Sequence, residues 1–504
     1  MVLDHARKLF NILFPSGVSD MPKKDESTQG ITVKKSDDVS EWYTQVIQKA
    51  ELADYSPVSG CMIYRPRVYS IWEKLQAFFD AGIKKLGVKN CYFPLLIPES
   101  LLKREAEHVE GFAPEVAWVT HGGHSELAER LAIRPTSETI MYDSYSKWIR
   151  SYRDLPLKLN QWNSVVRWEF KHPVPFLRGR EFLWQEGHTV FANKEDAEKE
   201  VLDILELYRM VFEEMLAVPV IKGRKSDNEK FAGADYSTSV ETLSPSGKAV
   251  QAATSHHLGQ RFAKSFEISF LNEKGEKSLP YQNSWGFSTR SIGAMILFHG
   301  DDKGVVIPPK VAPLQVIIVP IMFDDTKEKV IAKAREVAKQ LEKENILVEV
   351  DERDSYTPGW KFNEWELKGV CLRVEIGPKD LENRQAVVVR RDTGKKEIVK
   401  LPDLPFYVSN QLQVMQSDLF NKAKKFLDDN TVHAKSWADF EKGVKNRSVI
   451  YAPWCCTAEC AEHIKTLTEG VKCLNLPFNP PKPSGKCIKC EKLATHVAIF
   501  AKTY

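Results

Sequence analysis

The stretch that decides the fold reads Asn163-Ser-Val-Val-Arg-Trp-Glu-Phe170, and it is followed by Glu181-Phe-Leu-Trp-Gln-Glu-Gly-His-Thr-Val190. Side chains alternate between the two faces of a β-strand, so the first run places Arg167 and Glu169 on one face and apolar residues on the other. In the second run, the residues that share a face are Phe182, Trp184, Glu186 and His188. If the two runs pair as a hairpin, one face of the sheet collects an arginine, two carboxylates, two aromatic rings and an imidazole.

Neither run is decisive alone, because a solvated sheet face can carry polar residues that have no chemical role. Their combination resembles motif 2 of class II aminoacyl-tRNA synthetases, with Arg-x-Glu, a loop containing Arg178 and a return strand that opens with Phe182. The resemblance implies that Arg167 contacts the α-phosphate of ATP and an attacking carboxylate. It also implies that Glu169 accepts from the adenine amino group, that Phe182 stacks on the base and that Arg178 holds the distal phosphates.

Two further segments resemble the other motifs of this class. Gly286-Phe-Ser-Thr-Arg290 precedes a helical pattern and is similar to motif 3, in which a small residue admits the nucleotide and the arginine covers it. A helical period that ends at Gly87, with an extended run from Cys91 to Pro98 after it, resembles motif 1, which forms the dimer interface in this class. Pro94 cannot donate to a ladder and favours the edge of a sheet. We therefore expect a homodimer.

The amino acid is indicated by the stretches Arg134-Pro-Thr-Ser-Glu-Thr139, Phe170-Lys-His-Pro173, Phe182-Leu-Trp-Gln-Glu-Gly-His188 and Thr254-Ser-His-His-Leu-Gly259. Together they resemble prolyl-tRNA synthetases of the eukaryotic and archaeal type, from about Glu41 to Tyr504. This family activates L-proline with ATP to prolyl-AMP and transfers it to the 3′ end of tRNA(Pro). The chain is therefore expected to be an aminoacyl-tRNA ligase.

The resemblance implies two overlapping sets of binding residues, within which Arg167 and Arg290 are the expected catalytic residues. The expected ATP-binding set is Arg167, Glu169, Arg178, Gly179, Phe182, Gln251, Thr254, Ser288 and Arg290. The expected proline-binding set is Thr136, Glu138, Arg167, Trp184, Glu186, His188 and His256. Gln251 is also expected to contact Mg²⁺.

The chemistry of proline agrees with this assignment. Its secondary ammonium needs an acceptor, which Glu138 can supply, and its compact ring needs apolar walls such as Trp184, His188 and His256. Either histidine alone would more often be a structural residue. Their place beside the other motifs favours a role in binding.

Composition bounds the alternatives. The chain has 504 residues, 28% of them charged and 43% hydrophobic, with a formal net charge of +3. This length suggests about three domains, and no apolar run approaches the roughly 20 residues that a membrane span needs. The small net charge leaves an RNA partner undecided, because a binding patch is local. We expect a cytoplasmic protein that does not cross a membrane.

Six of the nine cysteines lie between Cys455 and Cys490. Such clustering is typical of a metal site in a reducing compartment rather than of a disulfide framework. Two close pairs predict a structural Zn²⁺ site made by Cys455, Cys460, Cys487 and Cys490, with four thiolates and no open position. Cys456 can replace Cys455 in this interpretation, and metal-free thiols are the alternative.

We expect four segments along the chain. Residues 1–40 form a partly disordered N-terminal extension, 41–310 the catalytic domain, 311–407 an anticodon-binding domain and 408–504 a zinc-binding domain. The expected fold class is α+β, with an antiparallel catalytic sheet, an α/β anticodon-binding domain and a C-terminal zinc-binding α/β domain.

Two rival functions remain open at this point. A threonine-specific relative would build a catalytic zinc site in its active site with cysteine and histidine, but no cysteine lies between Cys91 and Cys371. A protein that binds RNA without catalysis would not need all three phosphate-binding arginines, Arg167, Arg178 and Arg290. Both arguments favour the proline enzyme.

Overall fold

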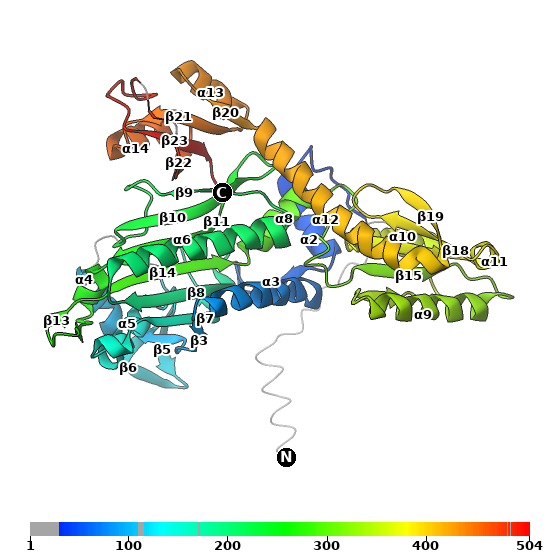
Figure 1. The fold of residues 1–504 in the computed structure, drawn as a ribbon, viewed down its shortest axis with the longest axis horizontal. Helices are drawn as coiled ribbons and strands as arrows, with labels where there is room; N and C mark the ends of the chain where they lie inside the picture. The colour runs from blue at the N-terminus through cyan, green and yellow to red at the C-terminus, as the bar shows by residue number, and fades with distance from the viewer. Residues whose placement is uncertain (1–29, 109–114, 170–171, 481, 484) are drawn as a thin grey trace, which may run out of the picture.

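The computed structural model of the protein describes residues 30–108, 115–169, 172–480, 482–483 and 485–504, and the side chains of 104–108 are outside this description. Its main feature is an eleven-stranded sheet (Figure 1). In spatial order the strands are β20 (Thr431–His433), β21 (Val449–Trp454), β23 (His496–Lys502), β22 (Val471–Pro477), β9 (Ile221–Arg224), β10 (Tyr236–Leu243), β11 (Ala249–Gly259), β14 (Tyr281–Ser288), β8 (Glu181–Phe191), β7 (Leu157–Val166) and β3 (Lys89–Asn90).

The sheet is mostly antiparallel, as the sequence predicted. Only its outermost pairs, β3 with β7 and β20 with β21, are parallel. The predicted hairpin is confirmed as β7 and β8, in which Asn163 pairs with Trp184 and Val165 with Phe182. Arg167 lies one residue beyond β7, yet its N–H still donates to the Arg180 carbonyl at 2.7 Å. Glu169 is in the turn that follows, so the strand face ends before it.

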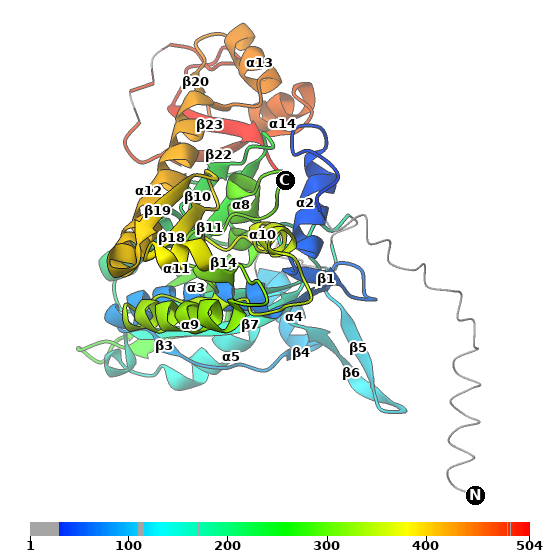
Figure 2. The ribbon, with the colours of Figure 1, turned by 90° about the vertical axis from the view of Figure 1, so that its right-hand side faces the viewer.

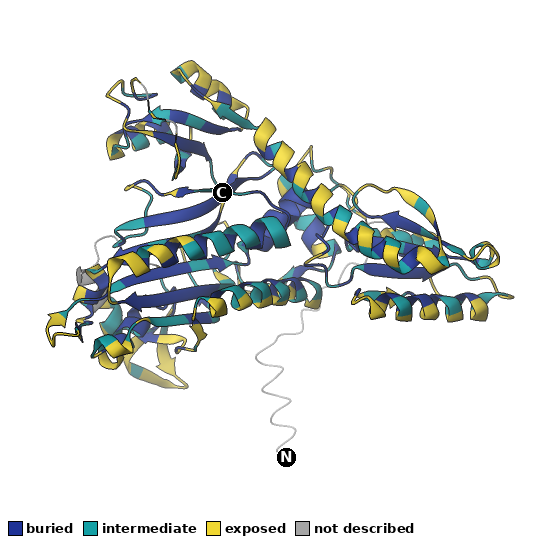
Figure 3. Cartoon of the chain, in the orientation of Figure 1, coloured by how far each residue is buried: buried dark blue, intermediate teal, exposed yellow. Residues whose placement is uncertain are grey.

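Two long helices cover one face of this sheet (Figures 1 and 3). They are α3 (Pro66–Lys85) and α6 (Lys194–Met210), the latter continued by a π-helical turn, η3 (Val211–Met215). The Asn193 side chain caps α6 by accepting from the Asp196 N–H at 2.9 Å, which satisfies an otherwise unpaired donor. The helical period that ends at Gly87 is confirmed by α3.

Aromatic side chains fill the space between these helices and the sheet. Phe79 of α3 stacks on Tyr208 of α6, with ring centroids 5.1 Å apart, and Phe287 of β14 packs edge-on against Phe79 at 5.2 Å. A Cβ atom at Gly187 would lie 2.2 Å from the ring of Trp285, so β8 can pass this tryptophan only as glycine. The close packing fixes β8 and β14, which carry much of the candidate site.

The extended run predicted for Cys91 to Pro98 is divided in the structure. β3 ends at Asn90, and β4 (Leu96–Pro98) joins a separate sheet in the order β4–β6–β5, with β5 (Trp118–Gly122) and β6 (Ser125–Ile133). Pro94 lies between the two strands because it has no N–H for either ladder. The β5–β6 hairpin projects from the body of the molecule (Figure 2).

Shorter elements surround the central sheet in the N-terminal part of the chain. They are α2 (Val39–Lys49), β1 (Ala53–Tyr55), β2 (Met62–Tyr64), α4 (Glu99–His108), α5 (Glu138–Trp148), η2 (Tyr152–Asp154), α7 (Arg261–Ser265), β12 (Phe270–Leu271), β13 (Lys277–Ser278) and α8 (Arg290–His299). Residues 1–29 of the expected N-terminal extension are outside the described residues. Its remaining part is docked, because Lys35 Nζ donates to the carbonyls of Leu297 at 2.6 Å and Gly300 at 2.7 Å.

A five-stranded sheet follows the central region in sequence. Its strands are, in spatial order, β16 (Val348–Val350), β15 (Val316–Pro320), β17 (Leu372–Ile376), β18 (Gln385–Arg390) and β19 (Lys396–Lys400). Its helices are α9 (Lys327–Lys343), α10 (Pro358–Leu367) and α11 (Pro378–Glu382). Arg391 donates to both carboxylate oxygens of Asp301 at 2.7 Å and so connects this sheet to the segment that follows α8.

The long helix α12 (Leu404–Asp429), preceded by η4 (Leu401–Asp403), runs from the five-stranded sheet to the C-terminal segment (Figure 1). The boundary expected at Val408 therefore falls inside one helix. The C-terminal segment adds α13 (Trp437–Lys445) and α14 (Ala458–Leu467). Its strand β22 pairs with β9, at Leu476 opposite Arg224, so that it continues the central sheet.

Across the described residues, no helix combines the length and the apolar composition needed to cross a membrane.

Candidate functional site

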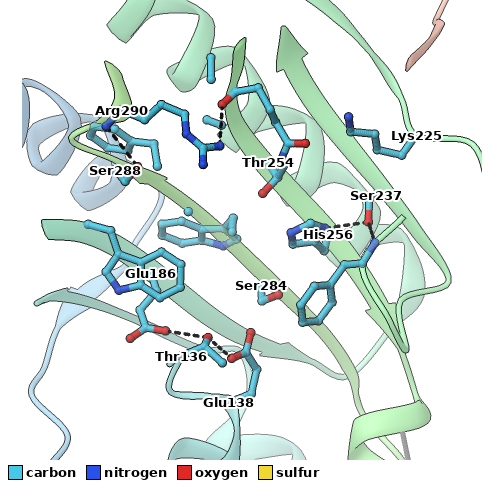
Figure 4. Close-up of a pocket in the computed structure, with 18 of the residues that line it drawn as sticks. Thr136, Glu138, Glu186, Lys225, Ser237, Thr254, His256, Ser284, Ser288 and Arg290 are labelled. Carbon is cyan, nitrogen blue, oxygen red and sulfur yellow. Dashed lines mark hydrogen bonds between the residues drawn. The ribbon is translucent and has the colours of Figure 1, made fainter. Parts of the chain in front are cut away.

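The candidate active site is a cavity of about 250 Å³ on the face of the central sheet opposite α3 and α6. Residues from β8, β11 and β14 form its floor, and the segment before α5 closes one end (Figure 4). The predicted residues that line it are Thr136, Glu138, Arg167, Phe182, Trp184, Glu186, His188, Gln251, Thr254, His256, Ser288 and Arg290. Residues far apart in the sequence thus meet in one pocket.

Two carboxylates and a threonine lie at the end of the cavity below β8. The Thr136 hydroxyl donates to Glu138 and lies 3.4 Å from Glu186 Oε2. Glu138 begins α5 and is buried, so its carboxylate is held at the N-terminus of a helix, where negative charge is stabilised. This carboxylate can accept hydrogen bonds from a cationic nitrogen.

Glu186 is surrounded by hydrogen-bond donors. It accepts from the Ser137 N–H at 3.0 Å and from Asn163 Nδ2 at 2.7 Å, and it lies 3.1 Å from His188 Nε2. Burial raises the pKa of Glu186, but His188 and the other donors outweigh it and lower the pKa well below its usual value. For His188, burial lowers the pKa, and the charges of Glu138 and Glu186 outweigh it, so that the pKa is raised. The pair is therefore ionised over a wide pH range.

Glu138, Glu186 and His188 also bring three potential metal ligands within 4.8 Å of one another. The donors around Glu186 already use both of its oxygens. The three side chains are therefore better suited to bind an ammonium group than to coordinate a metal ion.

His256 lies on the opposite side of the cavity from Glu138 (Figure 4). Its Nδ1 is 2.7 Å from the Ser237 hydroxyl, and its ring lies 4.9 Å from that of Phe231. Burial, together with the charges of Lys225 and His188, lowers the pKa of His256 to about 3. The imidazole is therefore neutral at physiological pH and offers an apolar face to a ligand.

The guanidinium of Arg167 lies beside the two aromatic rings of β8, Phe182 and Trp184. Its guanidinium carbon is 5.6 Å from the ring centre of Phe182 and 5.1 Å from that of Trp184, and its Nε donates to the Pro135 carbonyl at 3.0 Å. Burial lowers the pKa of Arg167, while the charges of Glu169, Glu138 and Glu186 oppose this effect. These contacts fix the plane of the guanidinium and leave its other donors for a ligand.

Arg290 begins α8, where Nε donates to the Leu177 carbonyl at 3.0 Å and Nη1 to the Gln251 carbonyl at 3.4 Å. Burial lowers its pKa to about 10, assisted by the charge of Arg167. The guanidinium is still positively charged at neutral pH. Arg167 and Arg290 therefore make the cavity attractive to a polyanion.

Three predicted residues lie outside this cavity. Glu169 is in the turn after β7, and Gly179 is in the loop before β8. Arg178 lines a second cavity of about 210 Å³, which shares Lys225, Glu229, Gln251 and Arg290 with the first. There Arg178 Nη2 donates to the Tyr504 carbonyl at 2.8 Å. The two cavities thus meet at Gln251 and Arg290.

The sequence analysis missed several lining residues, namely Lys225, Glu229, Phe231, Ser237 and Ser284. Most of them come from the irregular segment between β9 and β10 or from the start of β10. Such a segment has no hydrophobic period. The only feature of the sequence that could have indicated these residues is a cluster of polar side chains between two predicted strands.

The four cysteines of the predicted metal site come together in the C-terminal segment. Their sulfur atoms lie within 4.8 Å of one another, with 3.4 Å between Cys455 and Cys490 and 3.7 Å between Cys460 and Cys487. A tetrahedral Zn²⁺ with Zn–S distances of about 2.3 Å separates its sulfurs by about 3.8 Å, so the cluster fits this ion. Cys456 instead faces His496, with 3.3 Å between Sγ and Nδ1, so the cluster contains Cys455 and not Cys456.

An antiparallel sheet with a partly buried arginine at the turn of the hairpin β7–β8 and a second arginine at the start of the helix after β14 defines the catalytic core of a class II aminoacyl-tRNA synthetase. The family model described as "tRNA synthetase class II core domain (G, H, P, S and T)" matches residues 118–298. The "Anticodon binding domain" model matches 315–411, and the "Prolyl-tRNA synthetase, C-terminal" model matches 437–504.

Whole-chain relatives narrow the class to one family. The chain is 51% identical over 497 residues to "Proline--tRNA ligase, cytoplasmic" of Arabidopsis thaliana, covering 97% of this chain and 94% of the relative. It is 50% identical over 485 residues to "Proline--tRNA ligase" of Alkaliphilus oremlandii, covering 96% and 100%. The "Bifunctional glutamate/proline--tRNA ligase" of Mus musculus is 49% identical over 506 residues, which are 96% of this chain and 33% of the mouse protein. The chain belongs to the proline--tRNA ligase family.

Proposed function

We propose that the protein activates L-proline with ATP to prolyl-AMP and transfers the prolyl group to the 3′ end of tRNA(Pro). The observation that carries the proposal is the union, in one cavity, of a buried carboxylate pair with two partly buried arginines, Arg167 and Arg290. The carboxylates suit an amino group, and the arginines suit phosphates. Membership of the proline--tRNA ligase family supports the same reaction.

At the amino acid end, Glu138 accepts from the secondary ammonium of proline, and Thr136 orients that carboxylate. Glu186 and His188 hold this end of the pocket rigid through their mutual contact. The faces of Trp184 and His256 enclose the ring, and the neutrality of His256 keeps this wall free of charge.

At the nucleotide end, Phe182 stacks on the adenine, while Glu169 accepts from its amino group. Arg167 contacts both the proline carboxylate and the α-phosphate, so that it stabilises the charge that develops as the carboxylate attacks phosphorus. Arg290 covers the nucleotide and Arg178 holds the distal phosphates. The remaining members of the proposed ATP set, which border these groups, are Gly179, Gln251, Thr254 and Ser288.

Two metal ions belong to the proposal. Gln251 borders both cavities, and its carboxamide oxygen is a suitable ligand for Mg²⁺, which would neutralise phosphate charge when bound. Cys455, Cys460, Cys487 and Cys490 would hold a structural Zn²⁺. Four sulfurs leave no open coordination position, so this ion would have no catalytic role.

We further propose that the chain works as a homodimer in the cytoplasm. Apolar side chains near β4 and β5 are exposed at Leu95, Leu96 and Trp118, and Tyr92 is 71% exposed. A patch of this kind on a projecting sheet suits a second copy of the chain. The cytoplasmic assignment is supported by the name of the Arabidopsis relative and by the nine cysteines, none of which forms a disulfide bond in the described part of the chain.

The segmentation expected from the sequence is retained as part of the proposal, with residues 41–310 catalytic, 311–407 anticodon-binding and 408–504 zinc-binding. The five-stranded sheet and the match of the anticodon-binding model support the second unit. This unit would select tRNA(Pro), while the catalytic cavity would bind its 3′ end for transfer of the prolyl group.

Pyrophosphate exchange, measured with each of the 20 amino acids, tests the proposal. The proposal is supported if the rate of exchange with proline is far higher than the rate with threonine. Absence of exchange with all of them, from a folded protein that still binds RNA, would favour a role in RNA binding without catalysis.

A further inference from the structure

A buried lysine outside the predicted binding sets connects the candidate active site with the C-terminal segment. Lys225 follows β9 and lines both cavities. Figure 4 shows it among the residues of the first cavity. Its Nζ donates to Glu241 Oε1 at 2.6 Å and to the Leu474 carbonyl at 2.8 Å. Leu474 belongs to β22, so one ammonium group contacts the catalytic sheet and the C-terminal segment together.

The partner of this lysine is next to the ATP end of the site. Glu241 is buried on β10, directly opposite Gln251 on β11. Arg290 donates to the carbonyl of that same Gln251, and Glu241 and Arg290 line the second cavity together. Although burial dominates and lowers the pKa of Arg290, the negative charge of Glu241 acts in the opposite direction. Glu241 is therefore a carboxylate with two cations near it, Lys225 and Arg290.

A buried carboxylate is costly unless a positive charge compensates it. In the structure Lys225 supplies that charge through a direct contact, while Arg290 donates to main-chain carbonyls instead. Without Lys225, the carboxylate of Glu241 would be left to attract Arg290. An arginine paired with a carboxylate is less available to a phosphate.

We propose that Lys225 is a positioning residue for the ATP site. It neutralises Glu241, so that Arg290 remains available to the nucleotide, and the Leu474 carbonyl of β22 fixes the place of its ammonium group. The C-terminal segment thereby contributes to ATP binding through a contact at Lys225. This inference rests on the proposed function, because it assigns Arg290 to ATP.

The test is proline-dependent pyrophosphate exchange with the full-length protein, in which KM is measured separately for ATP and proline. Lys225→Met should raise the KM for ATP by about tenfold or more, since it leaves a buried charge unpaired, and should change the KM for proline little. Lys225→Met/Glu241→Gln should restore most of the ATP affinity, because the competing carboxylate is gone. Lys222→Met is the matched control, since Lys222 lies on β9 and pairs with Glu206 at the surface.

Two results would overturn the inference. One is a folded Lys225→Met protein with the parent KM for ATP, and the other is a double variant as impaired as the single one. If Lys225→Met does not fold, Glu241→Gln alone decides, because the inference requires its KM for ATP to be no higher than that of the parent. Failure of the parent protein itself to exchange pyrophosphate with proline would refute the proposed function, which separates the two failures.

Discussion

His188 Nε2 lies 3.1 Å from Glu186 Oε2, and both side chains are almost fully buried beneath the candidate proline site. The contact joins a histidine whose pKa is raised to a carboxylate whose pKa is lowered. Because each group is stabilised in its charged form, the pair makes the stability of the protein depend on pH in both directions.

The first prediction concerns this dependence. The contribution of Glu186 is complete above its ordinary pKa of 4.5 and is lost as the pH falls towards its lowered value. The contribution of His188 is complete below its ordinary pKa of 6.5 and is lost as the pH rises through its raised value. His188→Gln should therefore cost about 1.5 to 3 kcal/mol of unfolding free energy between these two pH values, and less in alkali. Urea unfolding over a pH series measures this difference.

His299 provides the matched control for that experiment. It is also buried, but burial lowers its pKa to about 4, assisted by neighbouring lysines. Its neutral form is therefore the stable one. The loss of unfolding free energy caused by His299→Gln should be smallest at acidic pH. A parallel pH dependence for the two variants would contradict the charge assignment of His188.

The second prediction is that Arg167→Ala strongly lowers proline activation without unfolding the protein. A preorganised donor to developing charge supplies about 3 to 4 kcal/mol, so proline-dependent pyrophosphate exchange should fall by two to three orders of magnitude. Arg335→Ala is the control, because Arg335 forms an exposed ion pair with Glu352 in the five-stranded region. A folded Arg167→Ala protein with parental exchange would refute the role given to Arg167.

The third prediction concerns the cysteine cluster. Protein purified without chelator should contain about one Zn²⁺ per chain by elemental analysis. Chelation, or Cys487→Ser/Cys490→Ser, should loosen the C-terminal segment and lower activity indirectly while ATP still binds. Cys456→Ser is the control, because Cys456 faces His496 instead of the cluster. Metal-free protein of full stability would end the proposal.

The fourth prediction concerns assembly. Sedimentation at micromolar concentration should give about twice the chain mass of 57.5 kDa. Leu96→Lys should weaken the dimer, because it places a charge in the exposed apolar patch beside β4. Leu202→Lys, at an apolar residue exposed on α6, should not. A fully active protein that is strictly monomeric would refute the dimer.

The fifth prediction concerns fidelity. The 95 residues between Val190 and Gly286 are used by α6, by strands of the central sheet and by short elements around it, which leaves no separate domain there. An apolar pocket discriminates against a missing methylene by only about 1 to 3 kcal/mol. Alanine should therefore be activated detectably, and Ala-tRNA(Pro) should persist when this protein is the only enzyme present. Its rapid hydrolysis by the purified chain would contradict this prediction.

Local sequence patterns predicted the centre of the site because strand alternation is a local property. The period of two along β8 placed Phe182, Trp184, Glu186 and His188 on one face, and all four line the cavity. The same rule failed for Glu169, because β7 ends at Val166 and the backbone turns there. A strand pattern does not reveal where its ladder stops.

Other features depend on contacts between distant parts of the chain. The role inferred for Lys225 requires Leu474, and 249 residues separate the two. The pairing of β22 with β9 is equally remote, and each strand alone is compatible with many partners. The cysteine spacing was informative despite such a separation, because four thiolates around one ion restrict the geometry more strongly than hydrophobic patterning does.

The junction of β22 with β9 also has a consequence for how the protein is made. During synthesis the strands of the catalytic sheet leave the ribosome long before β22 does. Until β22 is made, the N–H and C=O groups on one side of β9 have no strand to pair with. Such a strand can recruit another chain and begin aggregation. A protein truncated within α12 should therefore aggregate even though its catalytic sequence is intact. Premature termination before β22 should lower the solubility of the protein although the residues of the active site are all present.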